Sequence, residues 1–160
     1  MLKFSQYIKE ARRSQSSVSP SRQRYIERMN DSTREGKFKS QLPKFSNEEL
    51  DDHIANNFSF DLRDKVKRSS HDPSAPIDMT RPLPDSVKAL ARAAVYHFED
   101  GVRKTGEGLK YDHFPTYSEG KKQIFAASKL MKSHVGEHFG QLMTDNQTRP
   151  ILKKLISKEE

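Results

Sequence analysis

The stretch Val87-Lys-Ala-Leu-Ala-Arg-Ala-Ala-Val-Tyr-His-Phe98 decides the fold of this 160-residue chain. Its apolar residues recur at the three- and four-residue spacing of a helix, at positions 87, 90, 91, 94, 95 and 98. Pro84 precedes the stretch and Gly101 follows it, so we predict one long helix that begins after Pro84 and ends at Gly101. The Gly, Lys and Asp content of residues 101–115 predicts a loop, with a short extended piece over residues 109–111.

Helices are also expected on both sides of this stretch. Ser46 and Glu49 have the spacing of a capping box, which predicts a helix that ends near residues 56–57, with another over residues 58–66. Thr116 and Glu119 repeat the pattern before a helix that ends at Gly140. Its expected inner face consists of Ile124, Ser128, Met131, Val135 and His138. A last helix over about residues 149–158 is expected to bury Ile151, Leu152 and Leu155.

The whole pattern predicts a mainly α protein. No segment alternates polar and apolar residues as a strand would, and four prolines exclude long regular structure from residues 67–84. We expect a small helical domain over residues 46–160, with about three principal helices packed on residues 87–98. The chain has no cysteine, which excludes disulfides, zinc fingers and a thiol nucleophile.

The positive charge is concentrated near the N-terminus. The net charge is +7, and residues 46–160 contain eighteen Lys/Arg and eighteen Asp/Glu. Residues 11–45 contain three Asp/Glu, five serines between positions 14 and 21, and few aliphatic residues, which predicts a flexible basic arm with at most a short helix near Tyr25 and Met29. Such an arm can bind nucleic acid in a salt-sensitive, sequence-independent way, or can be only a solvated linker. Its cations are Arg12, Arg13, Arg22, Arg24, Arg28, Arg34, Lys37, Lys39 and Lys44.

The first eleven residues, Met-Leu-Lys-Phe-Ser-Gln-Tyr-Ile-Lys-Glu-Ala, form an amphipathic pattern. Phe4, Tyr7, Ile8 and Ala11 fall on one stripe of a helix, and the charged residues lie off it. The segment is too short and too charged to cross a membrane, and it lacks the apolar run of a secretory signal. We therefore expect it to dock on a protein partner.

This segment resembles the capsid-targeting sequence of the internal head proteins of T-even-type tailed phages. That sequence has an aromatic residue at position four and runs into a Leu/Ile-x-Glu pattern, after which the prohead protease cuts. Ile8-Lys9-Glu10 before Ala11 fits the pattern, and no other Glu in the chain has Leu or Ile two places before it. The resemblance covers these eleven residues only, and the rest of the chain resembles no family that we recognise.

The resemblance implies a virion protein with a processed N-terminus. Residues 1–10 would be the targeting propeptide, with Phe4, Tyr7 and Ile8 as its docking residues and Ile8, Glu10 and Ala11 as the cleavage site. The implied partners are the prohead core or scaffold, the maturation protease and non-specific DNA, with no membrane partner and an unknown host target. The implied locations are the phage head interior and the host cytoplasm, during assembly and after ejection.

Two other classes of protein stay open. One is a small helical protein that binds nucleic acid or a host factor and is not packaged. The other is a zinc-dependent hydrolase, because His134-Val-Gly-Glu137-His138 satisfies the inverted zincin pattern His-x-x-Glu-His. The spacing would let both histidines share a metal on one helix, although Gly136 loosens that helix and few acids follow it. We expect no enzymatic activity, cofactor or metal.

Overall fold

The computed structural model describes residues 20–78 and 80–157, and these residues are helical or irregular, with no strand. This confirms the prediction of a mainly α protein. In chain order the helices are α2 (Pro20–Gln41), α3 (Asn47–Asn57), α4 (Phe60–Arg68), α5 (Asp85–Lys110), α6 (Phe114–His134), α7 (Glu137–Thr144) and α8 (Arg149–Ser157).

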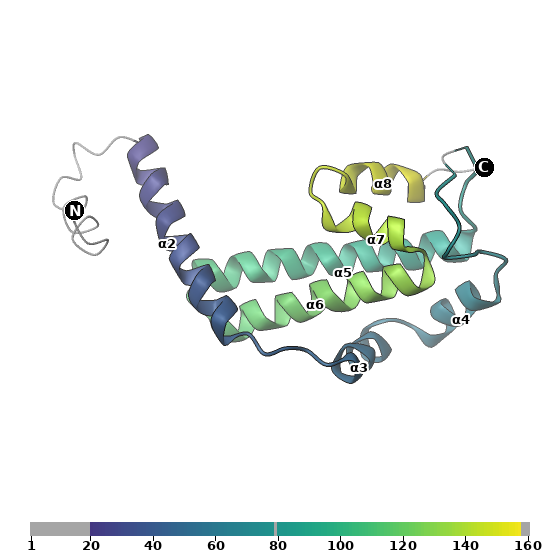
Figure 1. Ribbon diagram of the computed structural model, residues 1–160, viewed down its shortest axis with the longest axis horizontal. Helices are drawn as coiled ribbons and strands as arrows, with labels where there is room; N and C mark the ends of the chain where they lie inside the picture. The colour runs from purple at the N-terminus through teal and green to yellow at the C-terminus, as the bar shows by residue number, and fades with distance from the viewer. Residues whose placement is uncertain (1–19, 79, 158–160) are drawn as a thin grey trace.

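The centre of the fold is an antiparallel pair formed by α5 and α6 (Figure 1). Helices α3 and α4 pack along one side of this pair, and α7 and α8 fold back along the other side. The core between them is apolar, and it is centred on the predicted stripe of α5. Its fully buried members include Val87, Leu90, Ala94, Leu130 and Met131.

Helix α5 does not end at Gly101 but continues to Lys110. The prediction of a loop with an extended piece over residues 101–115 is therefore wrong as far as Lys110. Gly101 instead lies where α5 meets α6. A Cβ atom at Gly101 would be 2.7 Å from the carbonyl oxygen of Gly120, and one at Gly120 would be 2.6 Å from that of Gly101. Glycine at these positions therefore serves the close approach of two helices and not the termination of one.

The turn between α5 and α6 differs from the predicted capping box. Asp112 has a φ of +52°, a backbone conformation that Asp adopts more readily than most residues. His113 is the N-cap residue, and its Nδ1 accepts a hydrogen bond of 3.3 Å from the backbone N–H of Thr116. Helix α6 thus begins at Phe114, two residues before the expected cap, because a histidine fills the role that Thr116 was predicted to have.

Helix α6 ends at His134, six residues before the predicted end. Gly136 has a φ of +149° and separates α6 from α7, and a Cβ atom there would be 2.8 Å from the carbonyl oxygen of Pro73. The predicted inner face is therefore wrong in part, because Ile124 and Ser128 lie at its margin and His138 is exposed. The residues that α6 buries are Tyr117, Gly120, Gln123, Ala126, Ala127, Leu130 and Met131.

The smaller elements follow the predictions more closely. Helix α3 has the expected cap, in which the backbone N–H of Glu49 donates to Ser46 Oγ at 3.1 Å. The proline-rich connector between α4 and α5 contains no helix or strand over its described residues. Helix α8 buries Leu152 and Ile156, but Ile151 is 45% exposed, so the expected burial of Ile151 is wrong.

The prediction of a flexible arm is wrong for residues 20–41, because these residues form the single helix α2. The reason is a tertiary contact that composition does not reveal. Phe38 is only 3% exposed, and its ring lies 5.5 Å from that of Phe114 and 5.2 Å from that of Tyr117, centre to centre. Burial of this ring offsets part of the entropy that is lost when the segment is ordered.

The close approach of α5 and α6 predicts that Gly120→Ala is destabilising. The added methyl group would meet the Gly101 carbonyl oxygen at 2.6 Å and the Thr105 backbone nitrogen at 2.8 Å, so the helices must separate. We expect the free energy of unfolding, measured by urea denaturation, to fall by about 2 kcal/mol. Gly106→Ala is the control on the exposed side of α5, where no atom lies within 4 Å, and it should raise stability by about 0.5–1 kcal/mol. Equal effects of the two substitutions would contradict this account.

Candidate nucleic-acid interface

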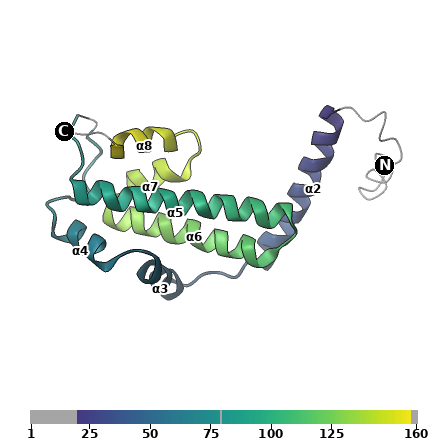
Figure 2. The same ribbon diagram turned by 180° about the vertical axis from the view of Figure 1, so that it is seen from behind.

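Helix α2 carries most of the predicted basic residues and is attached to the body near its C-terminal end. Figures 1 and 2 both show its first turns extending away from the α5–α6 pair. The sequence gives this helix six Lys/Arg and three Asp/Glu. The result is a positively charged helix, and most of its described side chains are exposed.

One of the predicted DNA-binding residues has a structural role instead. The guanidinium group of Arg34 donates hydrogen bonds to the carbonyl oxygens of Leu109 and Lys110 at the C-terminal end of α5. It also lies 3.7 Å from a carboxylate oxygen of Asp112. Arg34 thus neutralises the negative end of the α5 dipole and fixes α2 to the turn, so it is not available for phosphate.

The other described cations of this segment lie at the surface. The side chains of Arg22, Arg24, Lys37 and Lys44 are exposed. Lys39 is exposed too, and its Nζ lies 3.2 Å from Oε1 of Glu35, which is one helical turn earlier. Such a surface pair contributes little and can open when a phosphate approaches.

Several of the predicted site residues lie outside the described residues. These include the targeting residues Phe4 and Tyr7 and the cleavage-site residues Ile8, Glu10 and Ala11. Arg12 and Arg13 lie outside as well, and Arg28 belongs to α2 although its side chain is not described. The structure thus leaves the proposed propeptide and its cleavage site untested.

The zincin-like residues do not share a helix, contrary to the geometry assumed for a metal site. His134 is the last residue of α6, whereas Glu137 and His138 begin α7 beyond the break at Gly136. His138 is exposed, and Glu137 lies 3.9 Å from Lys132 Nζ. Over residues 20–78 and 80–157, no three His, Asp or Glu side chains gather as metal ligands.

A pair of histidines that sequence analysis missed lies between α3 and α5. The Nε2 atoms of His53 and His97 are 2.8 Å apart, so one ring donates a hydrogen bond to the other. The edge of the Phe58 ring packs against His97, with centroids 5.1 Å apart. In the sequence, each histidine lies at the margin of a predicted apolar stripe, which indicates partial burial. The two are 44 positions apart, so the sequence does not show that they meet.

Burial first, and then the neighbouring ring of His53, lowers the pKa of His97 to about 4. Burial likewise lowers the pKa of His53, with Lys122 and Lys104 acting in the same direction and Glu119 opposing them. Next to the pair, the amide of Gln123 donates to Asp100 Oδ2 at 3.0 Å, and the guanidinium of Arg103 donates to Asp100 Oδ1 at 2.7 Å. These two bonds lower the pKa of Asp100 to about 2. The cluster is therefore a neutral histidine pair beside a charged carboxylate.

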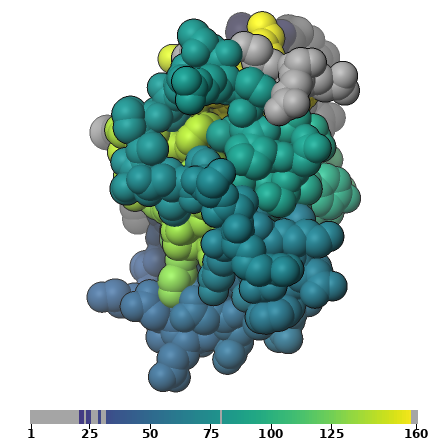
Figure 3. Space-filling model, turned by 90° about the vertical axis from the view of Figure 1, so that its right-hand side faces the viewer, coloured from purple at the N-terminus to yellow at the C-terminus, as the bar shows by residue number. Residues whose placement is uncertain are grey.

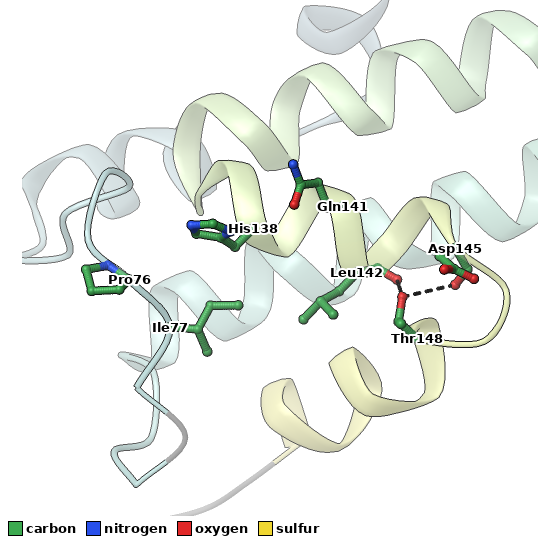
Figure 4. A pocket seen from close by; sticks show the side chains of 7 residues that line it. All are labelled: Pro76, Ile77, His138, Gln141, Leu142, Asp145 and Thr148. Atoms are coloured by element: carbon green, nitrogen blue, oxygen red, sulfur yellow. Dashed lines mark hydrogen bonds between the residues drawn. The ribbon is translucent and has the colours of Figure 1, made fainter.

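A hollow of about 520 Å³ lies between the connector and α7 (Figure 4). Pro76 and Ile77 line one side of it, and His138, Gln141 and Leu142 line the other. Among the side chains that line it, Asp145 and His138 are the titratable ones, and His138 contributes to no metal cluster in the described chain. Nothing in this hollow suggests a particular reaction.

No protein-family model, curated protein or solved structure matches this chain. None of the described helices is both long enough and apolar enough to cross a membrane.

The histidine pair predicts that stability falls in mild acid. Because the folded pKa of His97 lies below its ordinary value of 6.5, the unfolded chain binds the proton more tightly. The stabilisation is complete above about pH 6.5 and is lost as the pH falls toward about 4, by roughly 2 kcal/mol after allowance for solvent screening. Urea denaturation at pH 7 and pH 5 should detect about half of this loss, roughly 1 kcal/mol.

His97→Gln should remove the larger part of this pH dependence. His138→Gln removes an exposed histidine and should leave the dependence as it is in the unchanged protein. An identical pH dependence in all three proteins would contradict the assignment.

Proposed function

We propose that this chain is an internal virion protein of a tailed phage, directed to the prohead core by residues 1–10, cleaved after Glu10 and packaged beside the genomic DNA. The observation that carries the proposal is the sequence Ile8-Lys9-Glu10-Ala11 at the end of an amphipathic N-terminal segment. A Leu/Ile-x-Glu pattern occurs at no other place in the chain, so one cut at this position would leave the folded body whole.

The distribution of charge supports the DNA-binding part of the proposal. Helix α2 extends from a body whose residues 46–160 carry balanced charge, and it exposes Arg22, Arg24 and Lys37. A cationic helix releases counterions when it binds phosphates, and this requires no base-specific geometry. Such binding would offset part of the phosphate repulsion inside a filled head.

The body is proposed as a binding module and not as an enzyme. The metal site of the hydrolase alternative requires His134 and His138 on one helix, and the break at Gly136 separates them. By its resemblance, the protein would enter the host with the genome, and the helical domain would then meet a host partner. An unpackaged DNA-binding protein remains the alternative that the next experiment separates.

Mass spectrometry of purified virions tests the processing step. We expect a mature N-terminus at Ala11, and we expect Ile8→Ala and Glu10→Gln to leave the chain uncut, because each removes a recognised side chain. Neither substitution should change the unfolding transition, since both positions precede the described helices. Absence of the chain from virions, or an intact Met1 terminus there, would favour the unpackaged alternative.

Fluorescence anisotropy with labelled duplex DNA tests the binding surface. Arg22→Gln with Arg24→Gln should weaken binding by about tenfold near physiological salt and lower the slope of log affinity against log salt by about 2. Lys65→Gln on α4 with Lys154→Gln on α8 removes the same charge from exposed positions of the body and is the matched control. Equal losses of DNA affinity in the two double variants would mean that only the net charge of the protein matters. That result would contradict a DNA-binding role for α2.

A further inference from the structure

The contact between α3 and α5 is made by two histidine rings that face each other. His53 belongs to α3 and His97 to α5. Their Nε2 atoms are 2.8 Å apart, and the centres of the two rings are 5.0 Å apart. Two helices that are distant in sequence thus direct the same imidazole nitrogen toward one point.

These distances are close to those of two imidazole rings that share a zinc ion. With Zn–N bonds of about 2.0–2.1 Å and tetrahedral angles, the ring centres would lie about 5 Å apart and the nitrogens about 3.3 Å apart. The ring centres of His53 and His97 already have this separation. A small tilt of both rings would therefore admit the ion, because the nitrogens need to separate by only about 0.5 Å.

Both rings can present the lone pair that a metal ion requires. Burial lowers the pKa of each ring, for His97 to about 4, so both are neutral at pH 7. In the hydrogen bond between them, one Nε2 carries the proton. When an ion binds, that ring changes by exchange with water to the tautomer with its proton on Nδ1, so both Nε2 atoms are free and no net proton is released. The contact is only part-buried, which leaves a hydrated ion access to it.

A carboxylate lies next to the pair. Asp100 is one helical turn after His97, and the Gln123 amide donates to Asp100 Oδ2 at 3.0 Å and to the carbonyl oxygen of His97 at 3.4 Å. The ion-paired network around this carboxylate contains three acidic and two basic side chains, namely Asp100, Glu107, Glu119, Arg103 and Lys104. Its net charge of three negative and two positive groups favours a cation at the two rings.

We propose that His53 and His97 bind one zinc ion through their Nε2 atoms, with water in its remaining positions. Across the described part of the chain, no third His, Asp or Glu joins the pair to complete a cluster. Binding should therefore be reversible and weaker than at a closed site with four protein ligands. In Figure 1, α3 lies along the outer side of the α5–α6 pair, and the end-on view in Figure 3 shows the blue and teal segments that precede α5 at the surface.

A bound ion would help to hold α3 on the central pair. This helix is otherwise attached by burial of Ile54 and by the ion pair of Asp51 with Lys129 at 2.7 Å. An ion that binds the folded chain and not the unfolded chain stabilises the fold. The site depends neither on packaging in a virion nor on DNA binding by α2, and the pH dependence described above is that of the metal-free protein.

Two other accounts of these histidines make different predictions. The pair can serve only as a hydrogen bond between neutral rings, in which case zinc has no effect on it. Zinc can instead bind at His134 and His138, the histidines of the zincin-like pattern, which lie on different helices. Separate substitution of the two sets of histidines distinguishes these accounts from the proposed site.

The first measurement is a calorimetric titration of the full-length, EDTA-treated protein with zinc chloride at pH 7. We expect one zinc ion per chain. His53→Gln and His97→Gln should each weaken binding by more than about tenfold, because glutamine keeps a hydrogen-bonding group but lacks the imidazole ligand. His134→Gln with His138→Gln is the matched control and should bind zinc as the unchanged protein does. Magnesium chloride should not bind there, because Mg²⁺ prefers oxygen ligands.

The second measurement locates the ion by NMR of the histidine rings. Zinc should shift the resonances of His53 and His97 before those of the other histidines, and both rings should adopt the tautomer with its proton on Nδ1. Zinc at about 100 times its dissociation constant should also raise the Tm by about 5 °C. This rise should vanish in His53→Gln. Thermal unfolding without metal checks that each variant is folded.

Absence of saturable zinc binding at pH 7 would overturn the proposal. Equal binding by the unchanged protein and by His53→Gln would do the same, as would a loss of binding confined to the His134/His138 variant. His53 lies on the short outer helix α3, so His53→Gln gives the decisive result if His97→Gln does not fold.

Discussion

The approach of α5 and α6 at Gly101 and Gly120 is the constraint on which the rest of the structure depends. Each glycine lies against the backbone of the other helix, and Gly108 repeats the contact at the backbone nitrogen of Tyr117, 2.6 Å from where a Cβ atom would be. Helices that approach this closely exclude water from their backbones and align the small residues Ala94, Ala126 and Ala127 in the core. The long central pair then offers two sides on which the shorter helices pack.

In this arrangement the two ends of the α5–α6 pair make different contacts. At the α5–α6 turn, Arg34 and Phe38 attach α2 through a helix terminus and an aromatic cluster. At the other end, the break at Gly136 separates α6 from α7, which folds back against α6. The excess positive charge therefore lies at the end of the pair where α2 is attached, whereas residues 46–160 are neutral when they are counted as a whole.

The sequence predicts the elements of this fold better than their ends. The apolar stripe from Val87 to Phe98 and the Ser46 cap suffice to locate α5 and α3, because local periodicity and capping determine them. Gly101 was misleading, since a glycine that permits close packing and one that ends a helix look alike without the partner helix. Phe38 shows the same limit for α2, because its burial depends on Phe114, which is 76 positions later in the sequence. The basic residues were found from composition alone, whereas the contacts of Arg34 with the end of α5 required the tertiary structure.

The contacts between α2 and the body determine where a shortened fragment of the chain can begin and still fold. Phe38 covers the rings of Phe114 and Tyr117, and Arg34 holds the turn beside them. A fragment that starts near residue 33 would keep both anchors and the complete hydrophobic interior. A fragment that starts at residue 46 would uncover an aromatic patch at the tip of the hairpin and would be prone to self-association. The boundary of the minimal folding unit thus lies inside α2 and not at the change in composition that follows it.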